Sequence, residues 1–519
     1  MNRQTLVLMA ALLCADMMAQ KHHTTDRHDL LEGLEYKVEA QGSLSSDKTP
    51  LWLNANKYGL SSLDKSNGYL RGALQRPLGM DSLRRWGVGY GLDVAVAANY
   101  TSTLVVQQAY AEGRWLKGVV TVGSKQWPME MKNNRLSSGS QTLGINARPV
   151  PQVRLALDQW WNVFGVRWLA LKGHVAYGML TDDNWQKDFT QRKSKYAENV
   201  LYHSKAGYLR IGNPDSYMPL SAEVGLEMAS LFGGTAHIAD GNGGLMTVKG
   251  NTGFSAFKDA FIPGGSDATD GRYKNVEGDQ LGSWLARINY DADTWRVGVY
   301  YDKFFEDHSA MFQLDYDGYG QGSEWNTKKK HRYLLYDFSD MMLGIEFNLK
   351  YGTWLRDVVF EYLYTEYQSG PIYHDHTEGV SDHIGGRDNF YNHYIYAGWQ
   401  HWGQAIGNPL YTSPIYNEDG AIYFSNNRFM AFHLGASGQP AENLAYRLLA
   451  TYQEGLGTYD KPYTKKRHNV SFLVEAAYTL PKDWTVTAGY GMDFGSIIGH
   501  NHGFQLTVAK CGIFNRERK

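Results

Sequence analysis

The most constraining feature of this sequence is a repeated pattern in which apolar and polar side chains alternate along segments of about ten residues. Near the C-terminus, residues 470–479 alternate in this way, with Leu473 and Ala477 as exceptions. A short turn at 480–483 follows, and residues 484–493 alternate again. A period of two is that of a β-strand with one apolar face. The two segments therefore predict a β-hairpin.

The same hairpin pattern recurs along the chain. Alternation alone would also fit a soluble β-sandwich, whose polar face meets water. Three features favour a transmembrane barrel instead. The segments are about ten residues long, and short turns alternate with long polar connections. Aromatic pairs also lie beside the short turns, such as Tyr290/Trp295 and Tyr478/Trp484. The predicted fold class is an all-β transmembrane antiparallel β-barrel. Further strands of this kind are predicted at 88–100, 169–179, 284–290, 295–301, 341–349, 354–364 and 444–452.

Composition excludes several other classes. The chain has 519 residues and a mean hydropathy of -0.45, and after residue 20 no stretch is apolar for the roughly 18 residues that a transmembrane helix needs. A helical membrane protein is therefore excluded. Lys and Arg number 51 and Asp and Glu number 53, so no net positive charge recommends nucleic acid as a partner.

The N-terminus resembles an export signal. Residues 1–19 contain an apolar run and predict a secretory signal peptide cut after Ala19, which leaves 20–519 as a single barrel domain. Cys14 raises the alternative of a lipid-anchored cysteine, but Leu13 precedes it where a small residue is expected. After cleavage only Cys511 remains, so no intramolecular disulfide is expected.

Some segments do not fit the strand pattern. Residues 134–151 are rich in Ser, Gly and Asn and are predicted to cross or plug the lumen. Residues 254–261 place three Phe at helical spacing and predict a short helix at a barrel end. The long connections are predicted to face outside and to carry the function. They are 302–340, 366–392, 402–424 and 455–469.

No catalytic motif is present. The sequence lacks H-E-x-x-H, G-x-S-x-G and a Gly-rich phosphate loop with a lysine, so a non-enzymatic protein without cofactor is expected. Ser, His and an acid from different strands would escape such a search, which keeps an outer-membrane hydrolase or acyltransferase as an alternative. His374-Asp375-His376 offers adjacent metal ligands, but a closed site needs three or four convergent ones. No metal is therefore expected.

One segment has the composition of a sugar-binding site. Residues 386–409, GRDNFYNHYIYAGWQHWGQAIGNP, combine aromatic side chains with Asp and Asn. Aromatic faces stack on the C–H surfaces of sugar rings, while carboxylates and amides bind hydroxyls. The alternative is that these aromatics belong to strands and girdles and that the Asp and Asn cap turns.

This segment also resembles the capsule assembly Wzi family of outer-membrane proteins. The resemblance covers the chain from about residue 34 to 514. Other similar stretches are GINARPVPQV at 144–153, LYHSKAGYLRIG at 201–212, NVEGDQLGSWLARINY at 275–290, YYDKFFEDHSAMF at 300–312 and EYLYTEYQSGPIYHD at 361–375.

The resemblance implies a closed barrel of about eighteen strands with a filled lumen, located in the bacterial outer membrane. It implies a monomeric, non-enzymatic, lectin-like protein that helps attach and organise capsular polysaccharide. The implied partners are capsular or other surface polysaccharide and outer-membrane lipid, with no nucleic acid. By position, the expected glycan contacts are Asp388, Asn389, Tyr391, Trp399 and Trp402, and more weakly His374 and Asp375.

The main rival function is a porin or solute channel, which would use the same strands around an open lumen lined by charges. The same charges would seal the lumen if they paired across it. The predicted inward-facing charges are Arg287, Arg296, Glu346, Glu361, Arg447 and Glu475.

Overall fold

The computed structural model describes residues 30–213, 218–262, 278–306, 339–368 and 388–514, together with the backbone at 317–319, 328–330, 372–373 and 384–385. The predicted signal peptide, 1–19, lies outside the described residues, as do His374 and Asp375. Those expectations stay predictions.

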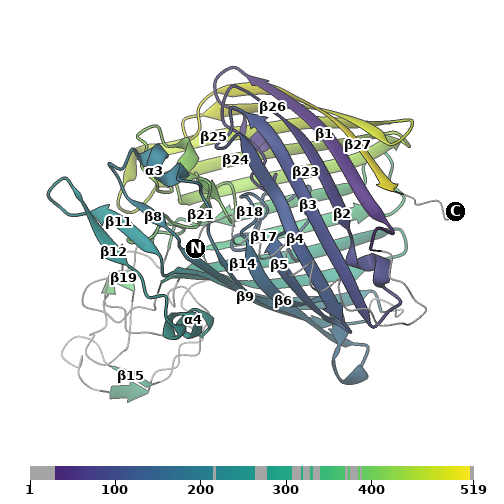
Figure 1. The fold of residues 1–519 in the computed structure, drawn as a ribbon, viewed down its shortest axis with the longest axis horizontal. Helices are drawn as coiled ribbons and strands as arrows, with labels where there is room; N and C mark the ends of the chain where they lie inside the picture. The colour runs from purple at the N-terminus through teal and green to yellow at the C-terminus, as the bar shows by residue number, and fades with distance from the viewer. Residues whose placement is uncertain are drawn as a thin grey trace.

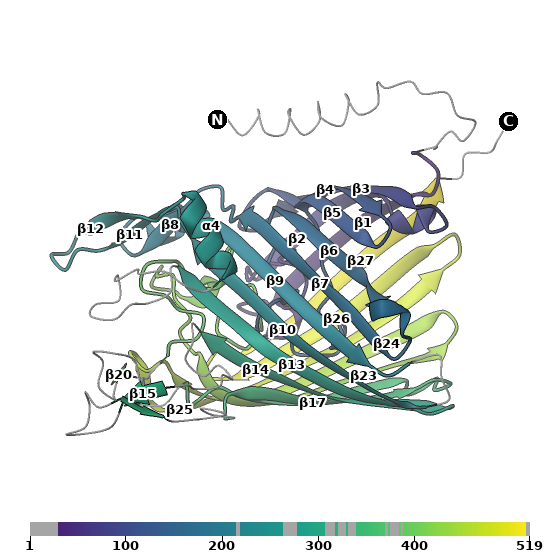
Figure 2. The same cartoon turned by 90° about the horizontal axis from the view of Figure 1, so that it is seen from below.

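Eighteen antiparallel strands form one sheet that closes on itself (Figures 1 and 2). Closure comes from the pairing of the first strand with the last, in a register that sets Leu34 opposite Phe514. The sheet therefore has no free edge, and the predicted antiparallel barrel is confirmed. In order, the strands are β1 (Leu34–Ser45), β2 (Ser66–Arg76), β3 (Trp86–Ala98), β4 (Leu104–Trp115), β5 (Gly118–Ser124), β6 (Gln152–Asn162), β7 (Leu169–Met179), β9 (Leu201–Ile211), β10 (Leu220–Phe232), β13 (Asp279–Asp291), β14 (Trp295–Glu306), β17 (Met341–Leu349), β18 (Asp357–Tyr364), β23 (Arg428–Ala441), β24 (Leu444–Gly457), β25 (Pro462–Leu480), β26 (Trp484–Gly495) and β27 (Asn501–Phe514).

The outer wall of the barrel is apolar. On β27, Phe504 is 48% exposed, whereas the next residue, Gln505, points inward and is 6% exposed. At the short turn between β13 and β14, the rings of Tyr290 and Trp295 stack with centroids 5.4 Å apart, as expected for an interfacial girdle. A wall of this kind is stable only against lipid, because water would meet a continuous apolar band. The chain is an outer-membrane β-barrel.

The two ends of the barrel differ. Short turns such as 292–294, 442–443 and 481–483 lie at one end, and the long connections lie at the other, which is the extracellular end in barrels of this class. No helix in the described part of the chain is long and apolar enough to cross a bilayer. The predicted helix at 254–261 is confirmed as α4 (Phe254–Phe261), which packs against β9 and β10 at their extracellular end (Figure 2).

The apolar core lies inside the barrel, because parts of the long connections fold into the lumen. The first insert, residues 125–151, joins β5 to β6 and confirms the predicted plug at 134–151. The second insert, residues 388–427, precedes β23 and includes a small hairpin of β21 (Gln400–His401) and β22 (Gln404–Ala405). The short helix α2 (Leu51–Asn54) adds Trp52 to the same core.

The prediction of extracellular loops is wrong for two segments. Residues 402–424 are mostly buried in the lumen, because their apolar side chains, such as Tyr411 and Phe424, join the interior cluster. Residues 455–469 are mostly strand, because β24 continues to Gly457 and β25 begins at Pro462. The polar side chains of this stretch do not alternate with apolar ones, so the sequence pattern did not predict a strand here.

A small sheet extends from the extracellular rim. It contains β8 (Tyr196–Glu198), β11 (Thr235–Ala239) and β12 (Leu245–Lys249), and Figure 2 shows it projecting away from the barrel. The helix α3 (Trp185–Thr190) lies in the same connection as β8, between β7 and β9.

Candidate functional site

The first insert is held by a buried carboxylate on the barrel wall. Glu361 on β18 accepts a hydrogen bond from the Ser138 backbone N–H at 2.8 Å and from the hydroxyls of Ser137 and Ser138. The Tyr300 hydroxyl on β14 donates to the same carboxylate at 2.6 Å. Hydrogen bonds to a charged group are stronger than neutral ones, so Glu361 is a principal anchor of the insert.

Inward charges pair rather than standing free in the lumen. Lys132 of the first insert lies 2.8 Å from Asp302, and both side chains are almost fully buried. The predicted inward charges also pair, with Arg287 to Glu346 at 2.8 Å and Arg447 to Glu475 at 3.0 Å. These two pairs lie along the barrel wall, between strands that are adjacent or one strand apart, and they do not cross the lumen. Of the other predicted charges, Glu361 is bound as described above, and Arg296 is exposed near a short turn.

Two of the expected glycan contacts instead join the inserts to each other. Tyr391 is fully buried, its hydroxyl donates to the Gln141 carbonyl, and its ring stacks on Tyr411 with centroids 4.0 Å apart. Trp399 is also fully buried and donates from Nε1 to the Thr142 carbonyl at 2.9 Å. Neither ring has a face open to a polymer.

Trp402 is half-buried and stacks on an arginine of the first insert. The Arg148 guanidinium carbon lies 4.1 Å from the centre of its ring. Cation–π contacts of this kind favour arginine over a tryptophan face. Trp402 therefore packs within the plug and does not line the pocket described next.

Asp388 and Asn389 line a pocket of about 520 Å³ on the extracellular side of the second insert. Asn389 Nδ2 donates to Asp460 at 3.1 Å, and Asn427 Nδ2 donates to Asn389 Oδ1 at 2.6 Å. Asp460 lies in the short connection between β24 and β25, so the pocket joins the second insert to the rim of the barrel. Carboxylates and amides that converge in this way suit hydroxyl-rich ligands.

Aromatic and basic side chains complete the pocket. Tyr394 is 59% exposed, whereas the Tyr423 ring is covered by Lys461, whose Nζ lies 4.0 Å from the ring centre. Lys195 donates to the His393 carbonyl.

Burial controls the protonation of two groups in the pocket. It lowers the pKa of Lys195 to about 8, an effect that the nearby Asp279 carboxylate opposes. Burial, and then the charge of Lys195, lower the pKa of His393 to about 3. His393 is therefore neutral at pH 7, and its Nδ1 accepts the backbone N–H groups of Ile395 and Tyr396.

The sequence located this pocket only in part. It pointed to Asp388 and Asn389, which the structure brings together, whereas Tyr391, Trp399 and Trp402 lie in the plug. Of the pocket residues that it missed, Tyr394 lies within 386–409 and Tyr423 lies later in the same insert, whereas the others come from connections that no spacing relates to residues 386–409. These others are Lys195, Asp460 and Lys461.

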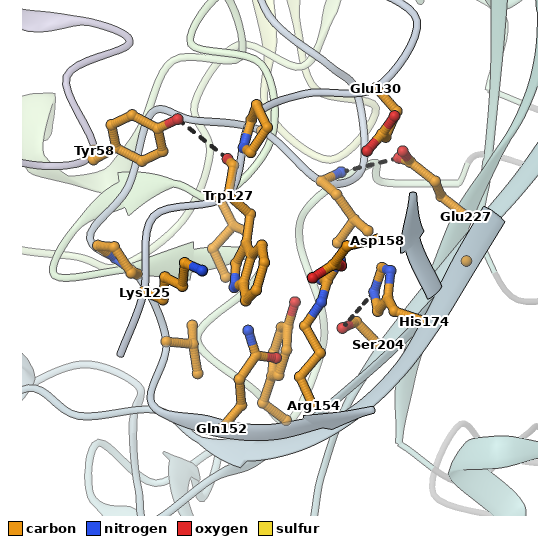
Figure 3. Close-up of a pocket in the computed structure, with 18 of the residues that line it drawn as sticks. Tyr58, Lys125, Trp127, Glu130, Gln152, Arg154, Asp158, His174, Ser204 and Glu227 are labelled. Atoms are coloured by element: carbon orange, nitrogen blue, oxygen red, sulfur yellow. Dashed lines mark hydrogen bonds and ion pairs between the residues drawn. The ribbon is translucent and has the colours of Figure 1, made fainter. Parts of the chain in front are cut away.

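A second, smaller cavity of about 90 Å³ lies between the first insert and the wall formed by β6, β7, β9 and β10. Figure 3 shows the indole of Trp127 between Lys125 and Arg154 at its edge. Lys125 Nζ lies 4.7 Å from the ring centre and the Arg154 guanidinium carbon lies 4.0 Å from it.

Side chains that meet in this cavity do not form a catalytic triad. His174 Nε2 lies 3.3 Å from Ser204 Oγ, but within the described ranges no carboxylate hydrogen-bonds to His174. A triad requires an acid that orients the histidine. The described residues also contain no group of three His, Cys, Asp or Glu side chains that is able to hold a metal ion.

Comparison with known proteins gives a likeness of fold only. No protein-family model matches the chain, and no curated protein matches it. Its structure resembles Wzi of Escherichia coli, an outer-membrane protein involved in group 1 capsule assembly and a carbohydrate-binding β-barrel, with a TM-score of 0.54 and 12% identity over 92% of this chain and 85% of that one. OccK5 (OpdH) of Pseudomonas aeruginosa gives a TM-score of 0.44 and 10% identity over 93% of this chain and 99% of that one.

Proposed function

We propose that this chain is a non-enzymatic, lectin-like outer-membrane protein that helps attach capsular or other surface polysaccharide to the cell. The observation that carries the proposal is the pocket lined by Asp388 and Asn389, which lies at the extracellular end of a lumen filled by protein. The resemblance of the sequence to the capsule assembly Wzi family, and the likeness of fold to a carbohydrate-binding barrel, support the same function.

The chemistry of the pocket suits sugar hydroxyls. The carboxylates of Asp388 and Asp460 are acceptors, and the amides of Asn389 and Asn392 are both donors and acceptors. The exposed ring of Tyr394 offers an apolar face for stacking on a sugar ring. Each contact is weak, but a repeating polymer engages many copies of the protein at once, which raises its retention at the surface.

The filled lumen argues against the rival function of a solute channel. Conduction requires a continuous water-filled route whose binding sites release the solute again. Here the two inserts cross the lumen and bind each other through Tyr391 and Trp399. A protein with this interior is better suited to hold a ligand outside than to pass one through.

The test is binding of the refolded, detergent-solubilised protein to capsular polysaccharide purified from its own host, with an unrelated polysaccharide as reference. Asp388→Asn and Tyr394→Ala are each expected to weaken binding about tenfold, which corresponds to about 1.4 kcal/mol. The matched control is Asp240→Asn at the tip of the β11–β12 hairpin, an exposed carboxylate outside the pocket. Selective binding that both pocket variants leave unchanged would refute the pocket as the binding site.

A further inference from the structure

Four residues that line the small lumenal cavity carry a buried polar atom without a hydrogen-bond partner among the described residues. The atoms are three donors, Trp127 Nε1, Arg148 Nε and Arg154 Nε, and one acceptor, Gln152 Oε1. Leaving a buried donor unpaired costs about 1–3 kcal/mol, so such atoms are rare in native proteins unless water or a ligand satisfies them. The presence of four such residues at one cavity points to an occupant.

In the part of the chain that the structure describes, neither arginine has a carboxylate within hydrogen-bonding distance. Arg154 stacks on Trp127, and its closest carboxylate, that of Asp158, is 3.9 Å away, which is too long for a hydrogen bond. Arg148 donates only to the hydroxyls of Thr101 and Ser102 among the described residues. Arg154 therefore retains unused hydrogen-bonding capacity at the cavity, whereas the Arg148 guanidinium, except for its Nε, binds Thr101, Ser102 and the Trp402 ring, which do not line it.

The other charged groups at the cavity have hydrogen-bonding partners. Lys172 binds Glu130 at 2.6 Å, and Lys125 binds Glu112 at 2.5 Å. Glu227 accepts the Tyr208 hydroxyl at 2.7 Å. Asp158 is therefore the carboxylate that competes most directly for Arg154.

We propose that this cavity binds a small oxyanion, the carboxylate or phosphate group of a small solute. Unpaired donors outnumber unpaired acceptors by three to one, which favours a ligand rich in acceptor oxygens. The cavity of about 90 Å³ equals the volume of roughly three water molecules in the liquid, which suits a single anionic group and excludes an oligosaccharide.

The anion would connect the plug to the barrel wall. Trp127 and Arg148 belong to the first insert, whereas Gln152 and Arg154 belong to β6. Glu361 holds the same insert on the opposite part of the sheet, through β18. A bound anion would therefore anchor the insert on its second side.

Calorimetric titration of the detergent-solubilised protein with inorganic phosphate and with acetate tests the proposal, with acetamide as an uncharged analogue of acetate. Saturable binding of at least one anion, and none of acetamide, is expected. Arg154→Gln should weaken binding at least tenfold, and Asp158→Asn should strengthen it several-fold. The matched control is Arg210→Gln, because Arg210 also stacks on a tryptophan, Trp160, but does not line the cavity.

Trp127→Phe provides a second variant if Arg154→Gln does not fold. It keeps an aromatic ring beside the arginine and removes the Nε1 donor, so anion binding should weaken several-fold. The proposal is overturned if the wild type shows no saturable binding, which would mean that the cavity holds water only. It is equally overturned if acetamide binds as acetate does, if Asp158→Asn weakens binding, or if Arg154→Gln and Trp127→Phe leave it unchanged.

Discussion

Tyr391 illustrates how much one side chain contributes to the interior of this barrel. Its hydroxyl donates to the Gln141 carbonyl of the first insert and accepts the Asn408 N–H of the second at 3.0 Å. Tyr391→Phe keeps the ring stack and leaves both backbone groups without a partner. We expect a loss of about 1–3 kcal/mol in stability, measured by thermal unfolding, while Tyr367→Phe at the rim should have little effect. An unchanged melting temperature would contradict this role.

Lys195 should make stability depend on pH. Burial lowers its pKa to about 8, whereas an unfolded lysine titrates near 10.4. Between these values the unfolded chain binds the proton more tightly, so stability should rise as the pH increases from about 8 to 10. Lys195→Met removes this contribution, and the wild type should therefore gain stability relative to the variant over that range. Melting temperatures of the wild type and of Lys195→Met that differ by the same amount at pH 7.5 and at pH 10 would refute the assignment.

The sequence predicted which side chains are chemically suited to bind sugars better than it predicted which of them are exposed. Asp388 and Asn389 were expected at a polar surface site and do line one. Tyr391, Trp399 and Trp402 have the same sugar-binding chemistry in sequence, but exposed and buried aromatics look alike until the partner segment at 134–151 is placed against them. Burial here depends on contacts between segments about 250 residues apart, which no local pattern encodes.

Among the elements, the turn between β25 and β26 carries a backbone conformation that its residues disfavour. Lys482 and Asp483 have φ angles of +64° and +61°. The left-handed region costs a residue with a Cβ roughly 1–2 kcal/mol, and glycine avoids this cost. Lys482→Gly should therefore raise stability by up to about 1 kcal/mol. Glu442→Gly, in a turn without positive φ, is the control and should not stabilise.

The first insert should depend on its carboxylate anchor. Glu361→Ala leaves Ser137, Ser138 and Tyr300 without their shared acceptor. We expect a loss of about 3 kcal/mol, because breaking a buried charged network is among the costlier substitutions. In planar bilayers the wild type should show no steady conductance and the variant should show transient openings. Equal conductance in both proteins would refute the anchor, and Asp240→Asn serves as the control.

The strands were predictable because apolar and polar side chains alternate along each hairpin with a period of two. The predicted strands 169–179 and 341–349 match β7 and β17 residue for residue. The path of the long connections was less predictable. Residues 402–424 carry no strand pattern and were expected to be an exposed loop, but their apolar side chains are buried in a lumen that is wide enough to enclose them.

For the whole molecule, the closed sheet and its apolar wall establish an outer-membrane barrel, and the comparison with solved structures agrees in fold. Function is not fixed at this scale, since barrels of one architecture serve different tasks. The proposed attachment of polysaccharide depends on the extracellular pocket, and its test is the binding experiment described above.

The pairing of β1 with β27 also has a consequence for biogenesis. These strands are the first and the last of the sheet, so they pair only after nearly the whole chain has been made. Both inserts begin and end at the open extracellular mouth, which lets them fold into the lumen from that end without crossing the wall. Because contacts between residues far apart in the sequence form slowly, closure of this seam should be the slowest pairing step of assembly.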